Sequence, residues 1–338
     1  MDAPDHFLGI DVAADTLAVA LTAGPRRHLA APASFSNDPD GFAELHAWLA
    51  THGATPEHTL LCLEATGVYG EALCYWFHEH RYPLAVEDPA RVKRAFPPSA
   101  AKTDAVDAGR IADYAARFLD ELRPWSPAEA VVEQVHTLLT MREQLVREQS
   151  AKRNALHVLQ RKVVQTPLAL RIAEDALGYL KARVKEIDAE VKRLVSEHPT
   201  MGAAVALLLS VPGVGVLLAA HLLVATRGFT DPLTARVFAA YLGICPLTHE
   251  SGSSVRRRPT SRGYGPSAMR KLLYMASMKL MQGEETEWGA YYRRKVGEGK
   301  SGRLVLNNLS NKLLRVLAGV LRSGVPYEEG HRSVRPAV

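Results

Sequence analysis

An apolar repeat with alternating spacings of four and three residues runs through the middle of the chain. It covers residues 131–163, breaks at Gln165-Thr166-Pro167, and resumes over residues 170–194. Such spacing places the repeat on one face of a helix and is typical of a coiled-coil seam, although Arg142, Gln149 and Lys152 are polar members of the first run. The sequence therefore predicts two long helices forming a coiled-coil hairpin over residues 126–200, paired within one chain or between subunits.

The part before this repeat alternates strand and helix patterns. Two hairpin-linked strands are followed by βα alternation, which implies a mixed sheet covered by helices in an α/β domain over residues 1–125. The predicted strands cover residues 7–12, 16–22, 28–35, 59–64 and 84–86, and the predicted helices cover 42–49, 72–77 and 104–119.

The part after the repeat reads as a mainly α domain over residues 201–325, followed by a flexible tail over 326–338. Residues 201–225 carry no charge and are long enough to span a bilayer, but Pro212, Gly213 and Gly215 divide them into two short helices. Helix-hairpin-helix elements use such a turn to bind a nucleic-acid phosphate with exposed backbone N–H groups. Gly213 and Gly215 are therefore candidate nucleic-acid contacts in a buried helical hairpin.

The charges are divided unevenly along the chain. The 338 residues carry 41 Lys+Arg and 36 Asp+Glu, a net charge of +5. Residues 1–125 hold 10 basic and 18 acidic side chains, whereas residues 201–338 hold 19 and 8. This division suits an acidic domain that holds cations and a basic domain that attracts a polyanion, although two domains can also differ in surface charge alone.

The amino-acid composition excludes several classes of protein. Hydrophobic residues make up 47% and charged residues 23%, which is ordinary globular usage and excludes wholesale disorder. The three cysteines form no CxxC pair, which argues against a disulfide scaffold and a Cys-type zinc site. Because the N-terminus has no apolar signal core, we expect a cytoplasmic protein, associated with the bacterial nucleoid if it binds DNA.

Four carboxylates occupy informative positions in the acidic part. Asp11 interrupts an apolar strand, Glu64 ends another, and Asp104 and Asp107 lie three residues apart on a predicted helix. Oxygen ligands of this kind could hold one or two Mg²⁺ ions, which activate a nucleophile and stabilise the leaving oxygen of a phosphodiester. Asp104 and Asp107 could equally cap the helix or face solvent.

The basic part carries a serine-rich loop inside a run of cations. From Ser251 to Lys271 there are six cations and no anion, which suits a phosphate ligand. A serine in such surroundings could be a nucleophile, although most loops of this composition are simply flexible. Ser251, Ser253 and Ser254 are the candidates. The candidate phosphate contacts are Arg256, Arg257, Arg258, Arg262, Arg270 and Lys271.

Several of these segments resemble the DEDD insertion-sequence transposases of the IS110 family. In the front part these are Gly9-Ile10-Asp11-Val12-Ala13, Leu63-Glu64-Ala65-Thr66-Gly67-Val68-Tyr69 and Lys102-Thr103-Asp104-Ala105-Val106-Asp107-Ala108. In the back part they are Val211-Pro212-Gly213-Val214-Gly215, Tyr241-Leu242-Gly243-Ile244-Cys245-Pro246 and Ser251-Gly252. The resemblance runs in order over most of residues 7–280, and it departs modestly at Cys245 and in the arginine-rich stretch after Ser254.

The resemblance implies an RNase H-like domain of RuvC type whose metal-binding set is Asp11, Glu64, Asp104 and Asp107. It also implies a coiled-coil middle and a transposase domain in which Ser251 is the nucleophile. A non-coding RNA that pairs with donor and target DNA is a further implication of the resemblance alone.

The sequence thus favours a Mg²⁺-dependent DNA transposase or recombinase that acts as a dimer or tetramer, with donor DNA, target DNA and a guide RNA as partners. Two alternatives stay open. One is a RuvC-like structure-selective endonuclease that uses water in place of Ser251, and the other is a non-catalytic nucleic-acid scaffold.

Overall fold

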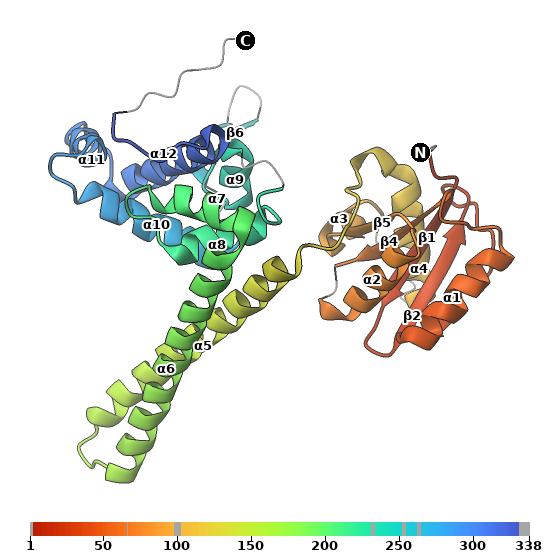
Figure 1. Cartoon of the computed structure of the whole chain (residues 1–338), viewed down its shortest axis with the longest axis horizontal. Coiled ribbons are helices and arrows are strands. Elements are labelled where there is room, and N and C mark those ends of the chain that lie inside the picture. Colours follow the sequence, from red (N-terminus) through yellow and green to blue (C-terminus); the bar gives the residue numbers. More distant parts are fainter. Residues whose placement is uncertain are drawn as a thin grey trace. The chain divides into compact units, whose positions relative to one another are not determined.

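The computed structural model describes residues 3–65, 67–97, 103–230, 234–251, 255–261 and 265–330, with the backbone alone over 246–251 and 255–260. The chain divides into two compact units, residues 1–127 and residues 128–338 (Figure 1). The first unit contains a five-stranded sheet and the second is mainly helical.

The sheet of the first unit is mixed, as predicted. Its order is β3-β2-β1-β4-β5, with β1 antiparallel to β2 and parallel to β4. The β2–β3 pair is antiparallel and the β4–β5 pair is parallel. The strands are β1 (His6–Val12), β2 (Thr16–Thr22), β3 (Ala33–Ser36), β4 (Thr59–Glu64) and β5 (Leu84–Glu87).

The third strand is shorter than the predicted span of 28–35. β3 begins at Ala33, and His28 forms only an isolated bridge with Thr22. Pro32 has no backbone N–H to donate and directly precedes β3, so the ladder does not continue through it. The prediction was therefore correct for the end of this strand and wrong for its beginning.

Helices cover both faces of the sheet. α1 (Pro39–Thr51) and α2 (Glu71–Glu79) pack on the face that carries Leu8, Ile10 and Leu63. α3 (Pro89–Arg94) and α4 (Asp104–Arg117) pack on the other face, with Phe7 and Cys62. Because the side chains of a strand alternate between faces, each strand supplies residues to both cores.

The contact between α4 and β1 is very close. A Cβ added to Gly9 would lie 2.1 Å from the carbonyl oxygen of Ala108 and 2.3 Å from the backbone nitrogen of Ala112. Glycine at position 9 therefore allows the backbone of the helix to lie directly against the central strand. This contact fixes the position of α4 along β1.

Two long helices open the second unit. α5 (Ala130–Gln160) and α6 (Pro167–Glu197) pack against each other, and the Arg142 guanidinium contacts the Asp188 carboxylate at 2.5 Å. The helices and the break between them match the predicted hairpin, while its coiled-coil character stays a prediction. The far end of the pair carries exposed apolar side chains, including the fully exposed Val163.

The remaining helices form one hydrophobic core with the near ends of α5 and α6. As predicted, the uncharged stretch folds as two short helices, α7 and α8, separated by a turn. The helices are α7 (Pro199–Leu209), α8 (Val216–Ala225), α9 (Ala235–Tyr241), α10 (Ser267–Met281), α11 (Glu287–Gly297) and α12 (Gly302–Ser323). Within the described ranges, no helix combines the length and apolar character needed to cross a membrane.

A β-hairpin stands where the sequence predicts only a loop. Strand β6 (Pro246–Ser251) pairs antiparallel with β7 (Val255–Ser261). Arginine-rich segments have no strong strand propensity, so the pairing between the two strands imposes this conformation rather than the local sequence.

The beginning of the predicted tail is anchored to the second unit. The backbone N–H of Tyr327 donates to the Ser210 hydroxyl at 2.8 Å, and a Glu329 carboxylate oxygen accepts from the Glu287 N–H at 2.9 Å. The flexible tail predicted over 326–338 stays a prediction, and its residues 331–338 lie outside the described residues.

The close contact at Gly9 can be tested with two alanine substitutions. We expect Gly9→Ala to destabilise the first unit by about 1–3 kcal/mol or more, because its methyl group would overlap the backbone of α4. Gly109→Ala is the matched control, since its nearest neighbour would be the His28 Cε1 atom at 3.9 Å and alanine favours helix by up to about 1 kcal/mol. Urea denaturation measures both, and an equally stable Gly9→Ala chain would contradict this packing.

Candidate functional site

Asp11 and Glu64 occupy equivalent positions on neighbouring strands. In the parallel β1–β4 ladder Ile10 is paired with Leu63, so the next residue on each strand is a carboxylate. Alternation places both side chains on the face that α4 covers, and both are half-buried. The two acids therefore lie side by side at the carboxyl ends of the central strands.

The first turns of α4 bring a third carboxylate to this edge. Ala108 lies over Gly9 of β1, and Asp107 directly precedes it. The Asp107 side chain is 32% exposed and lies 3.9 Å from the Arg110 guanidinium. Asp107 thus belongs to the same edge of the sheet as Asp11 and Glu64.

The electrostatics of Glu64 show that these carboxylates act on one another. Burial raises the pKa of Glu64, and the negative charges of Asp11, Asp107 and Asp88 raise it further. Like charges gathered in a half-buried place disfavour ionisation unless a cation neutralises them. This donor set of oxygens fits a hard divalent cation such as Mg²⁺.

Asp104 stands apart from the other three acids. It is exposed, occupies the first residue of α4, and is not among the charges that raise the pKa of Glu64. Thr103 caps this helix by accepting from the Val106 N–H at 3.3 Å, and an acid in the first turn also favours the helix dipole. A capping role therefore accounts for Asp104 as well as a ligand role does.

The acids are grouped electrostatically without forming a ready-made cage. Within the part of the chain that the structure describes, no three His, Cys, Asp or Glu side chains are close enough together to hold one metal ion. Binding a cation would therefore require side-chain movement at this edge.

Sequence reasoning missed one acid of this edge, Glu87. It ends β5, is paired with Glu64 in the β4–β5 ladder, and is only 5% exposed. The Arg91 guanidinium contacts it at 3.0 Å and also contacts Glu121 at 2.9 Å. Because Arg91 neutralises Glu87, this acid supports the edge structurally. Glu87 could have been found from the sequence, because it ends a short apolar strand as Glu64 does.

The candidate nucleophile lies in the second unit. Ser251 is the last residue of β6, and its backbone is paired with Val255 at the end of the hairpin. Gly252, Ser253 and Ser254 lie outside the described residues. The structure therefore gives Ser251 a defined backbone position beside the loop.

The candidate phosphate contacts of the basic run fall on two elements. Arg256, Arg257 and Arg258 belong to β7, and Arg256 is paired with Glu250 in the hairpin. Arg270 and Lys271 belong to the first turns of α10 and line a cavity of about 860 Å³. Arg262 lies outside the described residues.

The turn between α7 and α8 packs against α10. Gly213 has φ +81°, and a Cβ there would lie 2.9 Å from the Ala276 carbonyl oxygen, so this position needs glycine for both reasons. Gly215 is exposed and precedes the first residue of α8. The predicted nucleic-acid contact through Gly213 and Gly215 stays a prediction.

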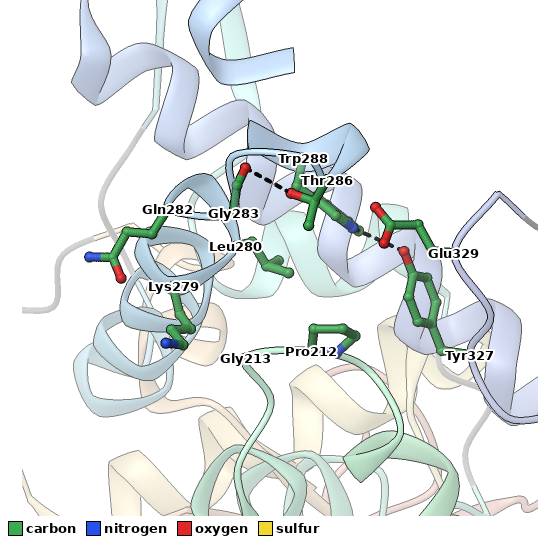
Figure 2. Close-up of a pocket in the computed structure, with 10 residues that line it drawn as sticks. All are labelled: Pro212, Gly213, Lys279, Leu280, Gln282, Gly283, Thr286, Trp288, Tyr327 and Glu329. Atoms are coloured by element: carbon green, nitrogen blue, oxygen red, sulfur yellow. Dashed lines mark hydrogen bonds between the residues drawn. The ribbon is translucent and has the colours of Figure 1, made fainter. Parts of the chain in front are cut away.

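Figure 2 shows Pro212 and Gly213 at one side of a pocket of about 280 Å³, across from Leu280 of α10. The Trp288 indole N–H donates to the Tyr327 hydroxyl at 3.0 Å and helps to close this pocket. The turn therefore has one face on α10 and one face on this small aromatic pocket.

Comparison with known proteins places the chain among the transposases. A DEDD transposase model matches residues 8–163, and a model described as the transposase IS116/IS110/IS902 family matches residues 205–293. The two matches together cover well over half of the chain. The chain belongs to this IS110-type family of transposases, as its motifs predict.

Two similar proteins match almost the whole chain, and a third matches less than half of it. The pilin gene-inverting protein of Moraxella bovis is 26% identical over 330 residues, which cover 96% of this chain and 98% of that protein. The protein of the same name from Moraxella lacunata is 25% identical over 331 residues. A 43.6 kDa protein of insertion element IS110 from Streptomyces coelicolor is 31% identical over 144 residues, 43% of this chain and 34% of that protein.

The grouping of carboxylates predicts that Glu64→Gln stabilises the fold when no metal ion is present. The raised pKa means that the neutral form of Glu64 stabilises the fold below about pH 4.3, the ordinary pKa of glutamate, and that this contribution is lost as the pH rises. At pH 7 in EDTA we therefore expect Glu64→Gln to melt at a higher temperature than the unmodified chain. Glu44→Gln, an exposed acid on α1, is the control and should change nothing.

In the presence of Mg²⁺ we expect the unmodified chain to melt at a higher temperature than Glu64→Gln. At about 100 times its Kd, an ion that binds only the folded state stabilises the unmodified chain by about 2.7 kcal/mol. The Glu64→Gln chain should gain much less. Equal Mg²⁺ responses of the two chains, measured by thermal melting, would show that Glu64 is not a ligand.

Proposed function

We propose that this transposase is a site-specific DNA recombinase that cuts and rejoins DNA with a carboxylate-bound metal and a serine nucleophile. The observation that supports it most is the grouping of Asp11, Glu64 and Asp107 at one edge of the RNase H-like sheet, with Glu64 under the charge of its neighbours. The match to a DEDD transposase model over the same residues agrees with this chemistry.

The four acids Asp11, Glu64, Asp104 and Asp107 would hold one or two Mg²⁺ ions. When bound, divalent ions of this kind polarise the phosphodiester and stabilise charge on the attacking and leaving oxygens. The role of the chain is to hold its carboxylates close together, so that a bound cation relieves the repulsion that disfavours their ionisation. Asp104 would have to turn toward the other three.

In this proposal the Ser251 hydroxyl attacks the scissile phosphate. A bond forms between Oγ and phosphorus, a phosphorus–oxygen bond of the DNA breaks, and the departing DNA hydroxyl gains the proton that the serine loses. Attack by a hydroxyl of another DNA strand reverses the step and frees the serine. The phosphodiester bond energy is conserved, so rejoining needs no further reactant.

The outcome depends on which two DNA sites are joined. Transposition is the reaction that the family's name gives, and inversion of a pilin gene is the reaction named for the full-length relatives. One recombinase can perform either, because exchange between two sites in opposite orientation inverts the DNA between them. We therefore propose inversion as a second reaction of the same site.

The proposed partners are donor DNA, target DNA, further copies of this chain and a guide RNA. Exchange between two duplexes requires several protomers, so we propose a dimer or tetramer. The exposed apolar far end of the α5–α6 pair supports coiled-coil pairing between subunits. Sequencing the RNA that co-purifies with the chain tests the guide, and RNA of random sequence would argue against it.

Ser251→Ala separates this function from hydrolysis by a RuvC-like endonuclease. We expect the unmodified chain, given Mg²⁺ and its recombination sites, to yield a covalent protein–DNA adduct that survives a denaturing gel. Ser251→Ala should abolish adduct and strand cleavage together, because the nucleophile is gone.

Ser253→Ala is the matched control and should retain both adduct and cleavage. Full cleavage by Ser251→Ala would instead support water as the nucleophile. Mg²⁺-independent binding without any strand scission would support the non-catalytic scaffold.

A further inference from the structure

A cavity in the second unit brings the last two cations of the basic run, Arg270 and Lys271, together with a cation of α12. The cavity of about 860 Å³ opens where the first turns of α10 and α12 meet the end of β7. Ser261, the last residue of β7, and Ile244, which shortly precedes β6, both line it. The cavity is therefore at the base of the β6–β7 hairpin.

The charged side chains that line this cavity are all cationic. Among the residues that the structure describes, they are Arg270, Lys271 and Arg303, with no carboxylate beside them. Lys271 and Arg303 are exposed, and neither takes part in an ion pair within the described residues. Cations gathered in this way repel one another, so the cavity favours an anionic ligand.

The other walls suit the sugar and phosphate groups of a nucleic acid. Tyr274 is 38% exposed and lines the cavity, and aromatic rings of this kind stack on bases. Ser301 caps the 22-residue helix α12, whose positive end reaches the cavity beside Arg303.

Asparagines of α12 connect the cavity to the hairpin. The Asn307 amide donates to the Ile244 carbonyl at 3.1 Å, and the Asn311 amide donates to the same oxygen at 3.3 Å. Ile244 is two residues before β6, so these bonds fix where the hairpin leaves the cavity. A ligand held in the cavity is thereby held at a defined place relative to β6.

The length of the hairpin sets the spacing between the cavity and Ser251. Pro246 is paired with Ser261 at the base, and Ser251 with Val255 at the other end. Five residues of strand span about 17 Å. Along the axis of B-DNA that length corresponds to the rise of about five base pairs.

We propose that this cavity binds the sugar-phosphate backbone of the DNA duplex that Ser251 attacks, about five base pairs along the duplex axis from the scissile phosphate. The identity of that duplex rests on the proposed function of Ser251. Lys271 and Arg303 contact phosphate oxygens, and Tyr274 contacts a sugar or base. These are positioning residues, and the contact is independent of DNA sequence.

Binding measurements on the full-length chain test the contact itself. We expect Arg303→Ala and Lys271→Ala each to weaken duplex DNA binding about tenfold, as loss of one charged hydrogen bond would, and to lower the slope of log K against log salt by about 0.9. Arg315→Ala removes an exposed cation further along α12 and is the matched control, so it should leave both quantities unchanged. Fluorescence anisotropy with labelled DNA at several salt concentrations measures both the affinity and the salt slope.

Three outcomes of this experiment would overturn the proposal. One is unchanged DNA binding by both variants, and another is an equal loss in Arg315→Ala, which would indicate a general charge effect. The third is a loss for a labelled RNA without a loss for DNA. None of these measurements requires strand cleavage, so they are independent of the result for Ser251→Ala.

Uncharged methylphosphonate groups placed singly along the DNA test the spacing. The unmodified chain should lose affinity where the substitution is about five base pairs from the cleaved position, and the affinity of Arg303→Ala should not change there. Equal sensitivity of both chains at that position would contradict the assignment.

Discussion

The contact between Gly9 and α4 is the constraint on which the arrangement of the first unit depends. Only a residue without a side chain allows the backbone of α4 to touch the central strand at Ala108 and Ala112. The amino-terminal turn of the helix then reaches the carboxyl ends of β1 and β4. The electrostatic interaction of Asp107 with Glu64 follows from that position. The packing of the two apolar cores holds together carboxylates that would otherwise repel one another.

Much of this unit could be predicted because its strands are short apolar runs between turn residues. The acids at the ends of those runs were visible for the same reason, and the family motifs identified them again. The i, i+3 spacing also placed Asp104 and Asp107 on one side of a helix. It could not show that Asp104 is exposed at the first residue, because exposure depends on how far α4 extends along the sheet. Glu87 was not predicted because an acid directly before Asp88-Pro89 is typical of a turn.

Less of the second unit could be predicted from its sequence. Helical periodicity predicted α5 and α6, and a proline with two glycines predicted the turn between α7 and α8. The β6–β7 hairpin was not predicted because its pairing is a property of two segments together. The basic cavity joins residues of α10 and α12 that are more than thirty positions apart, so no local pattern could reveal it. The sequence showed only that the region is cationic.

We propose that one edge of the sheet binds a divalent cation through Asp11, Glu64 and Asp107. Replacing Mg²⁺ by Fe²⁺ in the presence of ascorbate and peroxide produces hydroxyl radicals that cut the backbone next to the bound ion. Mass spectrometry of the full-length chain should then find cuts near residues 11, 64 and 107, suppressed by excess Mg²⁺ and absent from Glu64→Gln. Cuts elsewhere, or cuts at these places that excess Mg²⁺ leaves unchanged, would contradict the claim.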